Sequence, residues 1–298
     1  MKFSFWPNPA QDFETVAGLC AHAEATGWDG IWYADHFMPN AQDTSAPWPE
    51  CWTTLSALAG RVPRLRLGTL VMGNTYRHPA VLAKMAVTLD HISGGRLVLG
   101  LGAGWQENEH EQYGIPFYTV KERLERLDEA CEILTRLWRE EKSDFAGKHY
   151  TLTNASLEPK PLQAPLPLLV GGGGEKVTLR IAAKWAQEWN VWGTPETLAH
   201  KVNVLGRHCA DLGRDVTEIH KSAQALLFMS DDAAWLEGMR SRPMHMATMI
   251  GTPAELRDVV AAYADAGVDE LIIPDFTLGE GDAKRTAMDR FITEVARR

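Results

Sequence analysis

The stretch LRLGTLVMGNTYRHPAVLAKMAVTLDHISGGRLVLGL, residues 65–101, contains two apolar runs separated by one amphipathic segment. Leu65–Leu70 and Leu97–Leu101 have the length and composition of buried strands, and Val81–Ser93 repeats apolar residues at helical spacing. Two parallel strands need a long crossover connection, which is usually a helix. The stretch therefore predicts a β-α-β unit of a parallel sheet.

The same pattern of strand and helix continues along the whole chain. Strands are predicted at Lys2–Trp6, Trp28–Tyr33, Leu65–Leu70, Leu97–Leu101, Leu166–Val170, Glu188–Val191, Ile219–Phe228 and Leu271–Pro274. Helices are predicted at Asp12–Thr26, Cys51–Gly60, Val81–Ser93, Lys121–Glu141, Lys176–Ala186, Pro195–Leu212 and Ala283–Arg297. Eight units in 298 residues favour an α/β fold of the (β/α)8 TIM-barrel type. The alternative, a doubly wound open sheet, usually has fewer units.

Two insertions interrupt this pattern. Met38–Glu50 follows the second predicted strand and is rich in proline and polar residues, and Glu141–Pro167 follows the fourth strand and its helix. The second insertion contains DFAGKHYTL, residues 144–152, which is expected to form a hairpin. No change in composition marks a linker, so residues 1–298 are expected to form a single domain.

Composition excludes several classes of protein. Lys and Arg number 30 against 39 Asp and Glu, and the net charge of -9 argues against a nucleic-acid binder. The 4 cysteines form no C-x-x-C pair, so they are interpreted as single buried thiols in a reducing compartment. No apolar run approaches the ~20 residues of a spanning helix. Met1 leads directly into a predicted strand, and we expect a cytoplasmic protein without a signal peptide or membrane partner.

Polar residues follow several of the predicted strands. Asp35 and His36 follow the apolar part of the motif IWYADHF, and similar polar or glycine-rich segments follow the third, fourth and fifth strands. A lone Asp-His pair is more often the start of a loop, in which Asp35 caps a turn. Active sites of α/β barrels, however, lie at the carboxyl ends of the strands, where these segments would meet. His36 is therefore a catalytic candidate, because an imidazole can exchange a proton near neutral pH.

Two glycine-rich segments predict a binding site for a cofactor. The run GGGG, residues 171–174, leads into a helix and can surround a phosphate with backbone N–H groups; the alternative is a flexible helix start. In GLGAGW, Gly102 and Gly104 leave the backbone open to a flat ring, with Asn108 and Glu109 near the ring's edge. Close packing of strand against helix explains the second segment equally well.

Missing motifs narrow the chemistry further. The sequence has no H-x-H after the first strand, no G-x-S-x-G elbow, no cysteine paired with a motif histidine and no G-x-x-x-x-G-K-[ST] loop. A phosphate loop and a flat platform without a nucleophile or a metal set indicate that a bound cofactor supplies the chemistry. Trp32, Trp105 and Trp192 lie near strand ends and predict an aromatic pocket.

At these motifs the chain resembles the luciferase-like monooxygenase family, and within it the branch that uses the deazaflavin coenzyme F420. The resemblance rests on IWYADHF (31–37), LGTLVMGNTYRHPAVLAKMAVTLDHISGGRLVLGLGAGWQENE (67–109), EPKP (158–161) and GGGGEKVTLRIAAKWAQEWN (171–190). These motifs follow one another in the order expected of the family, whose fold is the barrel inferred above.

The resemblance implies roles for individual residues. Asp35 would contact the deazaflavin ring or orient its neighbour, and His36 would handle a proton near the reacting carbon. A non-prolyl cis peptide at Leu70–Val71, in the segment Leu70, Val71 and Met72, would prop the ring. Bordering the ring and its ribityl chain would be Asn74, Gly102, Ala103, Gly104 and Asn108. The phosphate would be received by Gly172, Gly173 and Gly174.

The implied activity is hydride transfer between coenzyme F420 and a small organic substrate, held between the ring and the loop Met38–Glu50. In the family's glucose-6-phosphate dehydrogenases a glutamate follows the G-x-G-x-G stretch, whereas this chain has Trp105, which favours an apolar or aromatic substrate over a sugar phosphate. The alternatives are an FMN-dependent monooxygenase fed with reduced flavin, a non-catalytic flavin-binding protein and a zinc-dependent hydrolase. The family also implies a homodimer formed through helices on the flank of the barrel.

Overall fold

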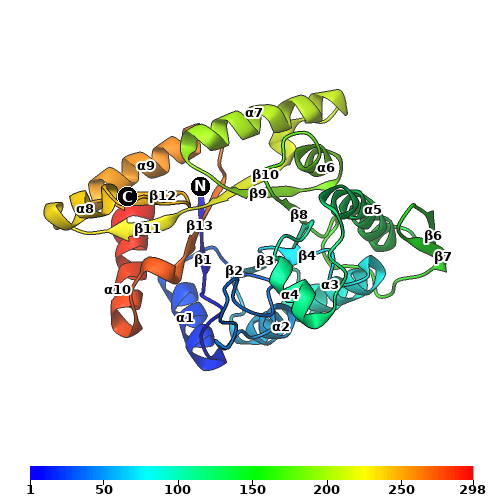
Figure 1. Cartoon of the computed structure of the whole chain (residues 1–298), viewed down its shortest axis with the longest axis horizontal. Coiled ribbons are helices and arrows are strands. Elements are labelled where there is room, and N and C mark those ends of the chain that lie inside the picture. Colours follow the sequence, from blue (N-terminus) through cyan, green and yellow to red (C-terminus); the bar gives the residue numbers. More distant parts are fainter. Residues whose placement is uncertain (298) are drawn as a thin grey trace.

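A closed barrel of parallel strands forms the centre of the computed structural model, which describes residues 1–297 (Figure 1). The eight barrel strands are β1 (Lys2–Trp6), β2 (Gly30–Tyr33), β3 (Arg66–Thr69), β5 (Leu97–Gly102), β8 (Leu168–Gly171), β9 (Glu188–Trp192), β10 (His220–Gln224) and β13 (Glu270–Pro274). Pairing of β3 with both β2 and β5 closes the ring. The first and last strands also pair, with Lys2 opposite Glu270. The predicted (β/α)8 TIM barrel is confirmed, and each predicted strand contributes to it.

Helices surround the barrel (Figure 1). They are α1 (Phe13–Thr26), α2 (Cys51–Arg61), α3 (Pro79–Ser93), α5 (Val120–Arg139), α6 (Thr178–Trp185), α7 (Pro195–Asp211), α9 (Pro253–Asp265) and α10 (Gly281–Arg290), which continues as a π-helical segment, Phe291–Ala296. Their starts follow local chemistry: Pro79 begins α3 behind His78, whose ring accepts the Ala80 N–H, and Thr119 with Glu122 forms a capping box for α5.

The interior of the barrel is filled by a small apolar cluster. Its buried members are Trp6, Trp32, Ala34, Leu70, Val98, Leu169 and Ile272. Trp32 reaches across the interior because Gly68 faces it, and a Cβ added at Gly68 would lie 2.2 Å from the indole. The Trp32 Nε1–H donates to Glu270 Oε1 at 2.9 Å, so the only polar atom of this side chain is satisfied.

A buried ion-pair network closes the amino-terminal end of the barrel. Arg66 bridges Glu188 and Glu270, and His220 Nε2 lies 2.9 Å from Glu270 Oε2. Burial raises the pKa of Glu270, but His220 and Arg66 outweigh it and lower the pKa to about 2. The ligand atoms of Glu188, His220 and Glu270 lie within 4.8 Å of one another, with the Arg66 guanidinium as their counter-charge. This network therefore holds strand ends together opposite the candidate site.

One predicted range holds two strands. Ile219–Phe228 was expected to hold the seventh barrel strand, which is β10 and ends at Gln224. A second strand, β11 (Leu226–Met229), leaves the barrel to pair in parallel with β12 (Thr248–Gly251). Helix α8 (Ala233–Arg240) connects this pair, and α9 follows it; neither was predicted. The partner of β11 is a four-residue strand that is distant in sequence, so no local periodicity marks the break.

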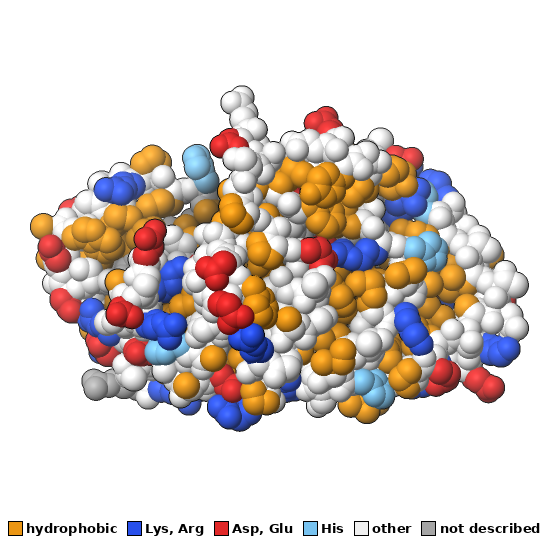
Figure 2. Space-filling model, turned by 90° about the horizontal axis from the view of Figure 1, so that it is seen from below, with side chains coloured by type: hydrophobic (Ala, Val, Ile, Leu, Met, Phe, Trp, Pro, Cys, Tyr) orange, Lys and Arg blue, Asp and Glu red, His pale blue; other side chains and the backbone are white. Residues whose placement is uncertain are grey.

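Both insertions are present. Residues 38–50 contain no helix or strand. The second insertion contains the expected antiparallel hairpin, β6 (Ser143–Ala146) and β7 (Thr151–Ala155), which projects beside α5 (Figure 1). The short α4 (Glu107–Tyr113) follows β5. Within residues 1–297, no helix combines the length and apolarity needed to cross a bilayer. Apolar side chains gather in patches between mixed charges on the face shown in Figure 2.

Candidate active site

A cavity of about 470 Å³ opens at the carboxyl ends of the barrel strands. Nine of the sequence-predicted residues line it: Asp35, His36, Leu70, Val71, Met72, Gly102, Ala103, Gly104 and Gly172. They come from the ends of β2, β3, β5 and β8 and from the short β4 (Met72–Gly73). The convergence that the strand ends predicted is therefore present in the fold, as expected for a parallel barrel.

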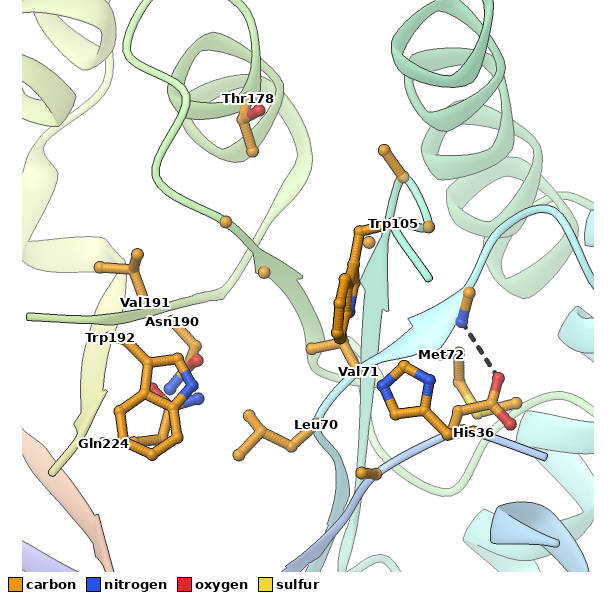
Figure 3. Close-up of a pocket in the computed structure, with 18 of the residues that line it drawn as sticks. His36, Leu70, Val71, Met72, Trp105, Thr178, Asn190, Val191, Trp192 and Gln224 are labelled. Atoms are coloured by element: carbon orange, nitrogen blue, oxygen red, sulfur yellow. Dashed lines mark hydrogen bonds between the residues drawn. The ribbon is translucent and has the colours of Figure 1, made fainter. Parts of the chain in front are cut away.

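His36 points into this cavity and is held from behind (Figure 3). Its Nδ1 lies 2.9 Å from Oε1 of Glu109, a carboxylate on α4 that is fully buried. The other oxygen, Oε2, accepts the Phe37 N–H at 2.8 Å, and the Tyr76 hydroxyl donates to Oε1. Burial would raise the pKa of Glu109, but the hydrogen bonds from His36, Tyr76 and Phe37 lower it. The carboxylate thus fixes the ring through Nδ1 and leaves Nε2 toward the cavity.

Asp35 lines the cavity but is occupied by protein groups. Its Oδ2 accepts the Gly73 N–H at 3.0 Å, drawn as a dashed line in Figure 3, and pairs with Arg77 Nη1 at 2.8 Å. Arg77 also binds Glu50 at 2.6 Å. Burial raises the pKa of Asp35, and Arg77 opposes this effect. Asp35 therefore anchors the segment that forms the floor of the cavity.

That floor is a bulge built on Val71. The Leu70–Val71 peptide bond is cis, as the resemblance implied. Val71 packs against bare backbone on both sides: a Cβ added at Gly102 or at Gly171 would lie 2.8 Å from a Val71 methyl group. β4 extends the floor by pairing Met72 with Leu101 and Gly73 with Gly102. An apolar side chain between glycines makes a surface that can support a flat ring.

The glycine run leads away from the edge of the cavity. Gly172 has φ 124°, a value that favours glycine, and its N–H donates to the Asn190 carbonyl at 2.9 Å. Lys201 Nζ donates to the Gly173 carbonyl at 2.8 Å. Hydrogen bonds within residues 1–297 leave the N–H groups of Gly173 and Gly174 unused, and no side chain caps α6. Free N–H groups, a lysine and a helix start together suit a phosphate.

Four predicted residues do not line the cavity: Asn74, Asn108, Gly173 and Gly174. Asn74 is buried, with Nδ2 3.5 Å from the Tyr150 hydroxyl. Asn108 Nδ2 donates to the Pro39 carbonyl at 3.0 Å, so its amide joins the insertion after β2 to α4. The lining residues also include none from positions 38–50, where the substrate was expected. The roles of these four residues and of the loop stay predictions.

Sequence reasoning missed one wall of the cavity. Trp105 and Trp192 line it as predicted, but Trp32 lies in the barrel interior, and Trp6 and Gln224 line the cavity instead. The signal was available, because β1, β9 and β10 end at Trp6, Trp192 and Gln224, respectively. The rule that brought the other strand ends together applies equally to these three.

Comparison with known proteins decides the family. The family model described as luciferase-like monooxygenase matches residues 1–240. The chain belongs to the luciferase-like monooxygenase family. As a luciferase-like protein, it combines the family's barrel with the cis peptide at Leu70–Val71 and a cavity at the carboxyl ends of its strands.

Curated relatives of this luciferase-like chain include two F420-dependent glucose-6-phosphate dehydrogenases. That of Amycolatopsis mediterranei is 36% identical over 166 residues, which cover 55% of this chain and 47% of the relative. That of Kineococcus radiotolerans is 38% identical over 165 residues, covering 55% and 48%. The match thus spans about half the length of these relatives.

Solved structures share the luciferase-like fold over nearly the whole chain. A coenzyme F420-dependent tetrahydromethanopterin reductase from Methanopyrus kandleri has a TM-score of 0.82 at 19% identity, covering 99% of this chain and 98% of its own. An F420-dependent secondary alcohol dehydrogenase has 0.85 at 19% identity, with the same coverage. A long-chain alkane monooxygenase has 0.79 at 15% identity, covering 98% and 89%. At these identities the likeness establishes the fold.

Proposed function

We propose that this protein is a coenzyme F420-dependent oxidoreductase, which transfers a hydride between the deazaflavin and a small organic substrate. One observation carries the proposal: the Val71 platform lies between two glycine backbones, and His36 stands at its edge. The F420-dependent curated relatives support the choice of cofactor. When bound, the deazaflavin supplies or accepts the hydride, so the protein itself needs no nucleophile.

Different residues would bind the ring and the phosphate of the cofactor. Leu70, Val71 and Met72 would support the ring, and the backbone of Gly102, Ala103 and Gly104 would border it. Asp35 would keep the floor in place through Gly73, and Asn74 and Asn108 would contribute from outside the cavity. The phosphate would lie at Gly172, Gly173 and Gly174 and would be bound by the free N–H groups of Gly173 and Gly174, because the Gly172 N–H already donates to the Asn190 carbonyl. Lys201, which is paired with Glu175, lies beside the run.

His36 is the proposed catalytic acid or base. Its Nε2 faces the cavity, and its Nδ1 is engaged by Glu109. A buried carboxylate that accepts from Nδ1 orients the ring and stabilises the imidazolium that forms when Nε2 takes a proton. Glu109 is accordingly a positioning residue, because it acts through His36.

Titration with two cofactors tests this proposal. We expect F420 to quench the protein's tryptophan fluorescence with saturable binding, and reduced FMN to bind more weakly without stimulating oxygen consumption. The second candidate is an FMN-dependent monooxygenase, since an alkane monooxygenase shares the fold. Tight binding of reduced FMN with oxygen consumption, and none of F420, would replace the first proposal with the second.

We also propose that the protein is a cytoplasmic homodimer whose residues 1–298 form a single domain. The free thiols of Cys20, Cys51, Cys131 and Cys209 are all buried and suit a reducing compartment. Val81 and Ile92 lie three helical turns apart on the outer face of α3, each with 56% of its surface exposed. Such a stripe suits a second copy of the same helix.

Light scattering after size exclusion tests the dimer. Wild-type protein should have the mass of two chains, and Val81→Asp with Ile92→Asp should shift it to one. Leu212→Asp, at an exposed position after α7, is the control and should leave the mass unchanged. A monomeric wild type would refute the assembly.

A further inference from the structure

The wall of the cavity that lies across from His36 is aromatic. Trp6 and Trp192 line it with ring centroids 5.9 Å apart, and Phe276 packs edge-on against Trp6 at 5.2 Å. Leu70 completes the apolar surface between them and the floor (Figure 3). On the His36 side, Trp105 stands edge-on to the imidazole at 5.4 Å with 61% of its surface exposed. The space above the platform is therefore bounded by indole rings on two sides.

Positive charge is missing from this lining. Among the described residues that line the cavity, none is lysine or arginine. Arg77 lies behind Asp35 and is paired with both Asp35 and Glu50. Lys201 contacts the glycine run, where it is paired with Glu175. A phosphate dianion placed between Trp6 and Trp105 would lose its hydration without a cation to replace it.

The polar groups of the wall are neutral. Asn190 and Gln224 line the cavity as amides, and Asn190 Nδ2 donates to Ser222 Oγ at 2.9 Å. Amides and an imidazole can hydrogen-bond to a hydroxyl or a carbonyl group, but they do not neutralise an anion. The aromatic walls and the neutral polar groups of the cavity therefore both favour an uncharged molecule with an apolar body.

We infer that the substrate is an uncharged alcohol, or the matching ketone, with an apolar body, and that Trp6, Trp105 and Trp192 determine its size. The inference rests on the proposed function, because the hydride acceptor is the deazaflavin. Oxidation removes a hydride from the carbinol carbon and a proton from the hydroxyl group. His36 Nε2 would accept the hydroxyl proton as the carbon–oxygen double bond forms. When bound, the deazaflavin would supply the two-electron acceptor for the hydride, so electrons and atoms balance.

Binding measurements on the F420-loaded protein test the substrate class. By calorimetry, acetophenone should bind at least about 100-fold more tightly than glucose 6-phosphate, because the phosphate finds no charged partner. In turnover, 1-phenylethanol should bleach the absorbance of F420 with a kcat/KM that exceeds that of glucose 6-phosphate by a similar factor. Tighter binding of glucose 6-phosphate, or binding of neither compound, would overturn the inference.

Variants of the indole side chains test whether they determine the size of the substrate. Trp192→Ala and Trp105→Ala should each shift the preference toward bulkier ketones, and Trp105→Phe should restore the original preference. Trp235→Ala, on the exposed surface of α8, is the matched control and should leave the preference unchanged. An unchanged preference in both cavity variants would contradict the assignment. Failure of the wild-type protein to bind F420 is a different outcome, because it would refute the proposed function itself.

Discussion

The Nδ1 atom of His36, in the loop after β2, lies 2.9 Å from Oε1 of Glu109, in the first turn of α4, although 73 positions separate the two residues. Glu109 has no exposed surface, and its two oxygens accept hydrogen bonds from His36, Tyr76 and the Phe37 N–H. The pair joins a candidate catalytic group in the cavity to a buried charge behind it.

Replacing His36 should separate chemistry from binding. We expect His36→Ala to lower kcat by about 10²- to 10⁴-fold, because the proton has no acceptor at the platform's edge. The Kd for F420, measured by fluorescence quenching, should change little, since the glycine run and Val71 remain. Undiminished turnover would remove His36 from the mechanism. F420 binding without any turnover by the wild-type protein would instead favour a non-catalytic flavin-binding protein.

Neutralising Glu109 should act through His36. Glu109→Gln keeps the shape of the side chain but removes the charge, so we expect kcat to fall by about 10- to 100-fold. The pH profile of kcat should also change, which a merely structural role would not produce. Glu107→Gln, an exposed neighbour on α4, is the control. Identical pH profiles for Glu109→Gln and wild type would exclude this coupling.

The platform should not accept an added methyl group. Gly171→Ala would place a Cβ 2.8 Å from Val71, so the floor must shift. We expect the affinity for F420 to fall by about tenfold or more, as for other overpacked sites. Gly60→Ala lies in α2 with no atom within 4 Å of the new Cβ, and it should leave affinity unchanged. Equal affinities for both variants in the same titration would argue against the platform.

Acid should weaken the network at the amino-terminal end of the barrel. The pKa of Glu270 is about 2 in the folded protein, below the ordinary value of about 4.3. Its ionised form therefore stabilises the fold above the ordinary value, and this contribution is lost as the pH falls toward 2. Glu270→Gln should flatten the dependence of unfolding free energy on pH in that window. It should also destabilise the protein near neutral pH by about 3–5 kcal/mol, because Arg66 loses a partner.

Urea titrations at several pH values measure both effects. Glu237→Gln, at an exposed position on α8, should retain the wild-type pH dependence. The same slope in Glu270→Gln and wild type between about pH 5 and 2 would show that the network does not contribute to acid stability.

Several parts of the molecule were predictable because their signals are local. Alternating strands and helices recur at regular spacing, and parallel strands can end only at a common rim, which brought Asp35, His36, Gly102 and Gly172 together. The cis peptide at Leu70–Val71 followed from the family resemblance, which the match over residues 1–240 supports. The departure of β11 from the barrel was not predictable, because its partner β12 is separated from it in the sequence by α8.

By itself, the sequence determined the barrel, the rim and the glycine-rich surfaces, because periodicity and backbone freedom are properties of neighbouring residues. Only the tertiary structure decided that Glu109 supports His36, that Asn108 binds Pro39 and that Trp6 faces Trp192. These contacts join residues that are far apart in the chain. Their geometry depends on how helices pack around the closed barrel, and no short window of sequence records that packing.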